Sequence, residues 1–272
     1  NKTNYMKLIS GTHVSSKVSI IALYPEKSEV YIESIANLIK SLNSAGETCV
    51  VVSNGIVPSD LLSIIESGKN IVILRKNFGR DFAAYKAGTL WLEKEYGLAS
   101  FHSIKYFNDT LLWNTSSNNI IENLNNFEWG GIFLNLASET HVNSFAMQFD
   151  GKVIDSPAFV EFWKRYLPSE FKRHAIHKGE IKLSTDLLKA GFKPKAIVDF
   201  EFVKSLLEKC AIADIHRILS IPRVSIYPSN NHIFEFVRNK DTDTLRSDLD
   251  LEVEEWRLQA ILEMGRVLYI CL

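Results

Sequence analysis

Short apolar runs alternate with amphipathic stretches along most of the chain, and this alternation predicts a sheet covered by helices. Lys17 to Tyr24, Thr48 to Ser53 and Asn70 to Arg75 are rich in β-branched residues, as expected of buried strands. Between them, residues 30 to 42 and 59 to 67 carry apolar positions at spacings of three and four, the pattern of helices that pack on a sheet. This β-α-β-α-β order predicts a mostly parallel sheet with right-handed crossovers.

A glycine-containing turn and another helix follow the third strand. Lys76-Asn-Phe-Gly-Arg-Asp81 breaks the apolar run, and residues 82 to 96 have helical composition. Residues 103 to 107 then alternate like a strand, which delivers Asn108-Asp109-Thr110 into a loop. In open α/β sheets the ligand crevice lies beyond the carboxyl ends of the strands, so we expect these two loops to face the same space.

The pattern is less regular after residue 113. The polar, asparagine-rich residues 114 to 126 predict loops, and the basic residues 172 to 178 predict a link. Further strands are expected at 129–135, within 141–149 and at 195–198, and helices at 156–166 and 180–190, with Ser59 and Ser156 as N-caps of their helices. We expect an α/β domain over residues 1–200 and a mostly helical C-terminal extension over residues 201–272.

Composition narrows the function classes. The 272 residues are 46% hydrophobic, enough for a large α/β core, and 31 basic against 32 acidic residues give no support for nucleic-acid binding. The three cysteines, Cys49, Cys210 and Cys271, show no CxxC pair, which favours a reducing compartment. No apolar run approaches the roughly 20 residues that span a bilayer. We expect a cytoplasmic protein, and because position 1 is Asn, partner domains of a larger polypeptide stay open.

Three segments resemble GT-A glycosyltransferases, and in particular the rhamnan synthesis protein F family of bacterial surface-polysaccharide enzymes. Arg75-Lys-Asn-Phe-Gly-Arg-Asp-Phe-Ala-Ala-Tyr-Lys-Ala-Gly88 resembles that family's asparagine-glycine-arginine-aspartate signature, which lies over the donor nucleotide. Phe107-Asn-Asp-Thr110 is similar to the element that takes the place of the GT-A metal motif. Gly179 to Phe192 resembles the helix that carries the catalytic base in family 2 glycosyltransferases.

The resemblance implies a GT-A-like, Rossmann-like fold and a nucleotide-sugar-dependent glycosyltransferase. It implies Glu180 as the catalytic base and a divalent cation, Mg²⁺ or Mn²⁺, on Asp109. The residues expected to bind the nucleotide sugar are Asn77, Gly79, Arg80, Asp81, Lys86 and Asn108. His141, His174 and His177 are candidates for contacts with phosphate or acceptor. The implied partners are a nucleoside-diphosphate sugar, with rhamnose as the first guess, and a glycan or lipid-linked glycan acceptor of a rhamnan, O-antigen or capsule.

Two departures from the family pattern bear on the chemistry. Asn108 stands where the usual metal pair has its first aspartate, and Gly179 stands where the base motif has its first acid. Arg80 would then supplement or replace the cation through charge-assisted hydrogen bonds to phosphate. We expect Glu180 near a helix start, where the helix dipole favours an ionised carboxylate.

Structural roles for the same residues, and alternative functions of the protein, stay open beside the glycosyltransferase interpretation. Asp109 also fits a loop-capping role, Glu180 fits a first-turn helix acid, and the histidines fit an exposed surface. The basic side chains fit a solvated face or a peripheral contact with anionic lipid; they are Lys164, Arg165, Lys172, Arg173 and Lys178. The alternative functions are a non-catalytic GT-A-like module that binds a nucleotide sugar or glycan, and a nucleotidyltransferase.

Overall fold

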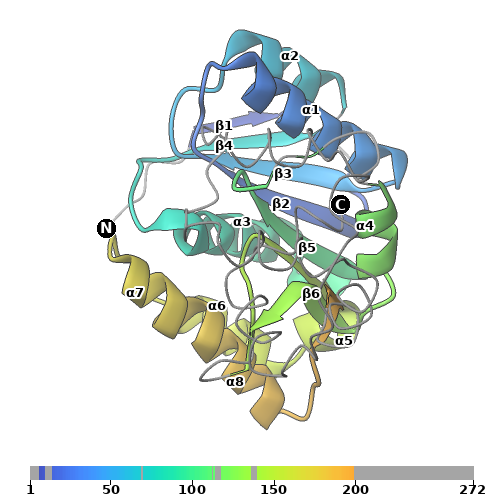
Figure 1. Cartoon of the computed structure of the whole chain (residues 1–272), viewed down its shortest axis with the longest axis vertical. Helices are drawn as coiled ribbons and strands as arrows, with labels where there is room; N and C mark the ends of the chain where they lie inside the picture. Colours follow the sequence, from blue (N-terminus) through green and yellow to red (C-terminus); the bar gives the residue numbers. More distant parts are fainter. Residues whose placement is uncertain are drawn as a thin grey trace, which may run out of the picture.

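A computed structural model of the chain describes residues 6–9, 14–68, 70–111, 113, 118–135 and 140–198. The predicted helical extension over residues 201–272 lies outside the described residues. In the described part, helices cover both faces of one mixed sheet (Figure 1). The prediction of an α/β fold with a mostly parallel sheet is confirmed.

Four parallel strands form the centre of the sheet. They are β2 (Lys17–Leu23), β3 (Thr48–Ser53), β4 (Ile71–Leu74) and β5 (Ser103–Asn108), in the order β4-β3-β2-β5. This order is the first half of a doubly wound sheet, in which the chain starts in the middle, moves outward and returns to the other side. The point where the direction reverses lies between β2 and β5, which pair in parallel.

The outer strands make the sheet mixed. An antiparallel strand, β1 (Met6–Ile9), pairs with β4 at one edge. On the other side β8 (Ala146–Asp150) pairs antiparallel with β5, and β6 (Trp129–Asn135) pairs antiparallel with β8. The short β7 (His141–Val142) and the final β9 (Lys195–Val198) both pair with β6.

Two apolar cores, one on each face of the sheet, follow from the alternation of side chains along the strands. Ile21 and Leu23 of β2 point to the core under α1 (Glu29–Ser44), α2 (Ser59–Ser67) and α4 (Asn118–Leu124). Ile20 and Ala22 point to the opposite core. That core is covered by α3 (Arg80–Tyr96), α5 (Gly151–Ile154), α6 (Pro157–Arg165) and α8 (Lys182–Lys189).

Helix α3 lies very close to β2. A Cβ atom at Gly88 would stand 2.8 Å from a methyl carbon of Ile20, so only glycine allows this approach. A short helix, η1 (Leu98–Ser100), then connects α3 to β5. The start of α3 is thereby fixed beside the carboxyl ends of β2 and β5.

Several sequence predictions were wrong in detail. Residues 118–124 form α4 where loops were expected, because Ile120, Ile121 and Leu124 supply an apolar face that packs on the sheet. The basic link is helical, as α7 (Lys172–His174) and the π-helix η3 (Ala175–Ile181), and it runs directly into α8. The N-cap of α2 is Pro58 instead of Ser59. The predicted Ser156 cap is confirmed by its hydrogen bond from the Phe159 N–H.

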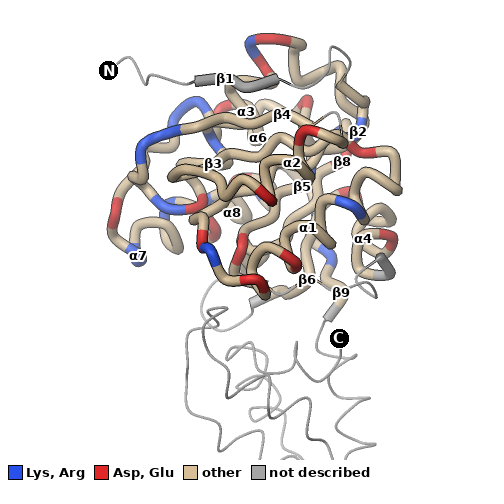
Figure 2. Tube along the Cα trace, turned by 90° about the horizontal axis from the view of Figure 1, so that it is seen from above, with Lys and Arg blue, Asp and Glu red and all other residues tan. Residues whose placement is uncertain are grey.

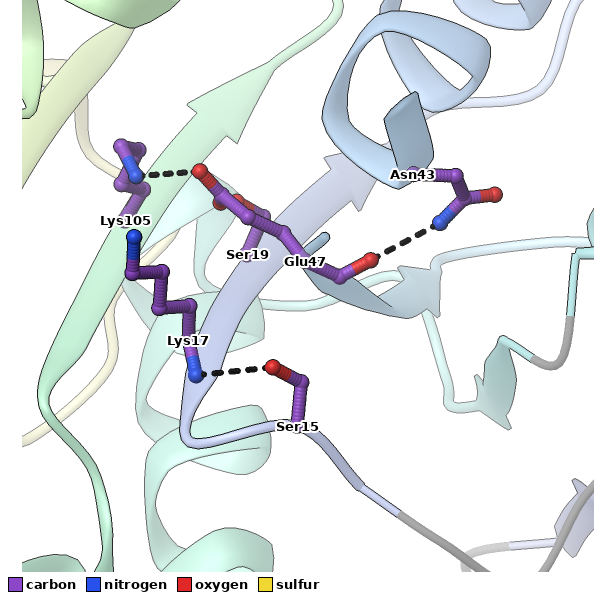
Figure 3. A network of polar contacts seen from close by, with 6 residues as sticks. All are labelled: Ser15, Lys17, Ser19, Asn43, Glu47 and Lys105. Carbon is purple, nitrogen blue, oxygen red and sulfur yellow. Dashed lines mark hydrogen bonds and ion pairs between the residues drawn. The ribbon is translucent and has the colours of Figure 1, made fainter. Parts of the chain in front are cut away.

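A buried ion pair lies at the amino end of the central strands (Figure 3). The Lys105 ammonium, on β5, is 2.5 Å from a carboxylate oxygen of Glu47, and both side chains are completely buried. The second carboxylate oxygen of Glu47 accepts from the Ser19 hydroxyl, and the Glu47 carbonyl accepts from Asn43. Both charged groups thus have charged or hydrogen-bonding partners within the protein.

No helix in the described ranges combines the length and the apolar character needed to cross a membrane.

Candidate functional site

The candidate site lies at the carboxyl ends of β2 and β5, where the direction of the sheet reverses. Ala22 of β2 is paired with Asn108 of β5, so Tyr24 and Asp109, just beyond these ends, are neighbours. Such a switch point leaves a crevice between two strands whose following segments turn to opposite faces. The structure therefore places the predicted loops at the position where open α/β sheets bind ligands.

Asp109 is held by two neutral donors, one just beyond β2 and one on α1. Its Oδ2 atom accepts a hydrogen bond of 2.6 Å from the Tyr24 N–H and one of 3.0 Å from the Tyr31 hydroxyl. Burial raises the pKa of Asp109 to about 7, and the neighbouring Asp81 carboxylate adds to this increase. Asp109 thus lies at the carboxyl ends of β2 and β5 as an acid whose two hydrogen-bond donors are uncharged.

Asp81, at the start of α3, meets Asn108 at the end of β5. The Asn108 amide donates a hydrogen bond of 2.7 Å to Asp81 Oδ2, so the two predicted loops do face the same space. Burial raises the pKa of Asp81 to about 6. An aspartate at position 108 would bring a second carboxylate against Asp81, which gives a physical reason for the asparagine at this position.

Glu180 approaches the crevice from η3. Its Oε1 accepts a hydrogen bond of 3.0 Å from the Ser144 N–H, and its Oε2 is 3.7 Å from His141 Nε2. The Tyr85 hydroxyl donates to the Ser144 carbonyl at 2.7 Å, so Ser144 connects Glu180 to α3. Burial raises the pKa of Glu180 despite these favourable contacts.

The predicted helix start at Glu180 was wrong. Continuous helical structure begins at Lys172, two turns earlier, and Glu180 lies inside a π-helical segment. The dipole at a helix N-terminus consequently does not act on Glu180, and burial instead disfavours its charged form.

Gly179 has a packing reason to be glycine. A Cβ atom at this position would stand 2.8 Å from a ring carbon of Phe82 on α3. The close approach of η3 to α3 brings Glu180 toward Asp81, whose pKa the Glu180 carboxylate raises further. A side chain at position 179 would push Glu180 away from the crevice.

Three carboxylates converge on one volume. Asp81, Asp109 and Glu180 all contribute to the raised pKa of the buried Tyr85 hydroxyl, after burial itself. Two further phenols, Tyr24 and Tyr166, also lie close to Asp81 and have raised pKa values, about 12 for Tyr166. Their hydroxyl groups are buried and have no hydrogen-bond partner among the described residues. Buried hydroxyl groups without a partner beside acids of raised pKa are typical of a ligand site.

The turn before α3 carries the predicted phosphate contacts. Gly79 (φ 84) and Arg80 (φ 55) both adopt left-handed backbone conformations, which are costly for Arg80 and concentrate at functional sites. Glu170 occupies their donors in this structure. Its Oε1 accepts from the Gly79 N–H at 2.5 Å, and its carbonyl accepts from Arg80 Nε at 3.0 Å. A phosphate at these donors would take the place of Glu170.

The remaining predicted contacts are spread over a wider region. The Lys86 ammonium donates to the carbonyls of Lys164 and Tyr166, at the end of α6, and Asn77 is exposed in the turn after β4. His141 alone of the three histidines lies beside Glu180, whereas His174 binds the Leu167 carbonyl at 2.7 Å and His177 is exposed. The roles assigned to these residues stay predictions.

The donor set fits a divalent cation that a diphosphate helps to hold. Within the part of the chain that the structure describes, no group of three or more His, Cys, Asp or Glu side chains is arranged to hold a metal ion. Asp109 and Asp81, however, are neighbouring carboxylates, and the Asp81 charge raises the pKa of Asp109. Hard cations such as Mg²⁺ prefer such oxygens, with phosphate and water completing the shell. The structure therefore offers a cation two protein ligands at most from this pair.

Sequence reasoning missed four residues of this site. Tyr24, Tyr31 and Ser144 hold the carboxylates, and Glu170 covers the start of α3. Tyr24 follows the first predicted strand directly, so the rule that ligands bind at carboxyl strand ends was a usable signal for it. The other three come from distant segments, and the sequence gives no signal for them.

Comparison with known proteins identifies a matching family and a relative. The family RgpF, described as Rhamnan synthesis protein F, matches residues 49–226. The uncharacterized protein y4gN of Sinorhizobium fredii (strain NBRC 101917 / NGR234) is 26% identical over 215 residues, which cover 76% of this chain and 55% of that protein. The chain thus spans about half the length of this curated relative.

Solved structures share part of the architecture at low identity. The glycosyltransferase GlyE of Streptococcus pneumoniae TIGR4 is 14% identical with a TM-score of 0.41, over 94% of this chain and 62% of that one. The 4-diphosphocytidyl-2C-methyl-D-erythritol synthase of Anaerococcus prevotii DSM 20548 is 12% identical with a TM-score of 0.42, over 66% of this chain and 86% of that one. Both TM-scores are below 0.5, so neither likeness bears on the function.

Proposed function

The chain belongs to the rhamnan synthesis protein F family, and from this premise we propose that it is a GT-A-like glycosyltransferase of bacterial surface-polysaccharide assembly. It would move a sugar from a nucleoside-diphosphate sugar to a growing glycan. The observation that carries this proposal is the convergence of Asp81, Asp109 and Glu180 on the switch point of the sheet. Asp81 and Asp109 accept hydrogen bonds from neutral donors, and Glu180 accepts one from the Ser144 N–H and lies 3.7 Å from His141 Nε2.

Glu180 is the proposed general base. In this reaction the acceptor oxygen forms a bond to the anomeric carbon, its proton passes to the Glu180 carboxylate, and the bond from the anomeric carbon to the diphosphate oxygen breaks. A single displacement of this kind inverts the anomeric centre. A base works best when its pKa lies near the working pH, and burial moves the pKa of Glu180 in that direction.

The donor diphosphate is proposed to lie between the start of α3 and Asp109. The Gly79 N–H and the Arg80 guanidinium are donors suited to phosphate oxygens once Glu170 leaves them. A cation held by Asp109, with Asp81 beside it, would supply Lewis-acid neutralisation of the leaving diphosphate. The buried hydroxyls of Tyr24 and Tyr166 would donate to oxygens of the donor.

The finer assignments rest on the family alone. Rhamnose is the proposed sugar, a deoxythymidine or uridine diphosphate its carrier, and a glycan or lipid-linked glycan its acceptor. A cytoplasmic location at the inner face of the plasma membrane would bring the chain to such an acceptor.

A second candidate, a nucleotide-sugar-binding module without catalysis, is favoured by the loss of one acid from each motif. Asn108 and Gly179 stand where the metal pair and the base motif usually have their first acids. Under this alternative the protein binds a nucleotide sugar but transfers no sugar to any acceptor.

A thermal-shift screen with nucleoside diphosphates and nucleotide sugars, each with and without Mg²⁺ or Mn²⁺, tests the proposed donor site. A ligand that binds only the folded state raises its stability by about 2.7 kcal/mol at a hundredfold excess over Kd. We expect one nucleotide to raise the Tm, and Asp109→Ala to remove the metal-dependent part of that rise. Asp60→Ala, on the exposed first turn of α2, is the matched control. A set of nucleotides that all leave the Tm unchanged would contradict both candidates.

A further inference from the structure

A second surface, beside the crevice, exposes large apolar side chains. Phe78, Leu167 and Phe171 are 50%, 74% and 77% exposed, although residues of these types are usually buried. Phe78 comes from the turn between β4 and α3, whereas Leu167 and Phe171 flank the segment between α6 and α7. Two segments far apart in the sequence thus contribute to it.

Contacts between these two segments bring the three side chains to one place. A Cβ atom at Gly79 would stand 2.5 Å from Pro168 Cβ, so the backbones approach closely. The hydrogen bonds from Gly79 and Arg80 to Glu170 fasten the same segments together. Phe78 adjoins Gly79, Leu167 adjoins Pro168 and Phe171 adjoins Glu170, so each exposed side chain is one residue from a contact.

Basic side chains surround these apolar ones. Lys164 and Arg165, at the end of α6, have side chains that are 53% and 81% exposed. The other exposed cations next to the apolar residues are Lys76, Lys172 and Arg173. Lys and Arg segments gather on the side of the molecule where α7 lies (Figure 2). We call the three apolar and five basic residues together the rim.

Few acids offset this charge. Glu161 pairs with Lys164 and Arg165, and Glu170 faces the Gly79 N–H. The rim therefore carries an excess of positive charge, although the whole protein has a net charge of -1. The excess is local, and it coincides with the exposed apolar side chains.

We propose that the rim binds the surface of an anionic lipid bilayer. Exposed aromatic and aliphatic side chains enter the boundary between headgroups and acyl chains, and Lys and Arg beside them are attracted to anionic headgroups. An apolar patch without cations would instead suit a protein partner, and a basic patch without apolar side chains would suit a soluble anion. The combination selects the membrane surface.

The rim borders the crevice because Arg80 and Asp81 directly follow Phe78 and Gly79. Binding through the rim would hold the start of α3 at the membrane, where a lipid-linked acceptor is located. The inference itself goes beyond the proposed transfer and does not depend on it, because binding to vesicles requires neither donor nor acceptor.

Co-sedimentation of the full chain with lipid vesicles tests the proposal. We expect binding to vesicles of phosphatidylglycerol and phosphatidylcholine, weakened by high salt, and little binding to phosphatidylcholine alone. Each cation that is removed should weaken binding about fivefold, so Lys172→Gln together with Arg173→Gln should weaken it about twenty-five-fold. Replacing two apolar side chains with Leu167→Ser and Phe171→Ser should weaken it about tenfold or more.

Matched control variants on other surfaces show whether a loss of binding is specific to the rim or follows from any loss of charge or apolar surface. Lys94 and Lys152 have side chains that are each 80% exposed, and Lys94→Gln with Lys152→Gln removes the same charge. Leu188→Ser removes a partly exposed leucine from α8. All variants should keep the wild-type circular dichroism spectrum. All except Leu188→Ser, whose leucine is only 37% exposed, should also keep the wild-type Tm, because the replaced side chains are largely exposed.

The outcomes separate the possible occupants of the rim. Loss of vesicle binding in the rim variants alone supports the proposal. An absence of binding to anionic vesicles, or equal binding by rim and control variants, overturns it. A wild-type dimer in light scattering that the rim variants convert to a monomer, without vesicle binding, would assign the rim to a second copy of the chain instead.

Discussion

The buried charged groups at the two ends of the central parallel strands have different kinds of partners. At the amino end, Glu47 and Lys105 are fully buried, lie 2.5 Å apart and have further hydrogen bonds from the surrounding chain. At the carboxyl end, Asp81, Asp109 and Glu180 accept hydrogen bonds mainly from neutral amide and hydroxyl groups, and their pKa values are raised.

The difference separates stability from function. A buried charge with a close partner of opposite sign keeps its charge, and removing either partner leaves an uncompensated ion in the interior. Acids whose pKa values are raised by burial and by neighbouring carboxylates are instead stabilised when they bind a cation or a proton. We therefore expect the amino end to stabilise the sheet, and we propose the carboxyl end as the ligand site.

The largest expected effect is that of Glu180→Gln, which tests the carboxyl end. We expect kcat for sugar transfer to fall by about 10² to 10⁴, the usual contribution of a general base, while the Tm stays at or above the wild-type value. In the wild type, kcat should rise with pH as Glu180 loses its proton, starting above the usual range for a glutamate because its pKa is raised. An acceptor-dependent transfer assay measures both quantities.

Two outcomes would count against this role of Glu180. Wild-type kcat in the Gln variant would remove it as the base, and an unchanged pH profile would do the same. Glu161→Gln, on the exposed face of α6, is the control and should leave the activity unchanged.

The second test acts on the amino end. Lys105→Met leaves the Glu47 carboxylate buried without its cation, which should lower the free energy of unfolding by about 3–5 kcal/mol. Urea denaturation measures this as a lower midpoint. Adding Glu47→Gln to the same chain should recover much of the loss, since the unpaired charge is then gone. A single variant as stable as wild type would show that the pair does not hold the sheet.

The smallest expected effect is a gain of stability in Asp109→Asn. An aspartate has a pKa of about 3.9 when unfolded, and Asp109 has one of about 7 when folded. Because the folded pKa is the higher, the contribution of Asp109 to stability is complete below pH ~4 and is lost as the pH rises through ~7. At pH 8 with chelator present, the Asn variant should therefore be about 1–2 kcal/mol more stable than wild type. This gain corresponds to a Tm that is a few degrees higher.

The same two proteins compared at pH 4 supply the control, because there the Tm difference should disappear. A variant that is less stable than wild type at pH 8 would show that Asp109 serves as a loop cap, the structural alternative.

Local sequence was enough to predict most helices and strands and one contact between distant segments. The β-branched runs Lys17 to Tyr24 and Thr48 to Ser53 became β2 and β3, because period-two burial is encoded in each run itself. The predicted meeting of the two loops is confirmed by the bond from Asn108 to Asp81, because the topology rule for parallel strands fixes which ends lie together.

Other parts of the site could not be predicted from sequence. Glu180 was expected at a helix start, but it lies inside the π-helical segment η3, which packs closely against Phe82 at Gly179. Lys86 lies within the glycine-arginine-aspartate segment but binds carbonyls at the end of α6. Both outcomes depend on contacts between segments about eighty to a hundred residues apart, which no local pattern records.

By itself, the sequence determined most strands and helices, and which polar residues stand at the carboxyl strand ends, because periodicity and turn chemistry act over a few residues. It did not predict β1 (Met6–Ile9). Only the tertiary structure decided which charges are paired. Glu47 and Lys105 find each other across β2, whereas Asp81 and Asp109 accept hydrogen bonds from neutral donors and Glu180 lies 3.7 Å from His141 Nε2. The physical reason is that the cost of a buried charge depends on its neighbours in space, and folding alone sets those neighbours.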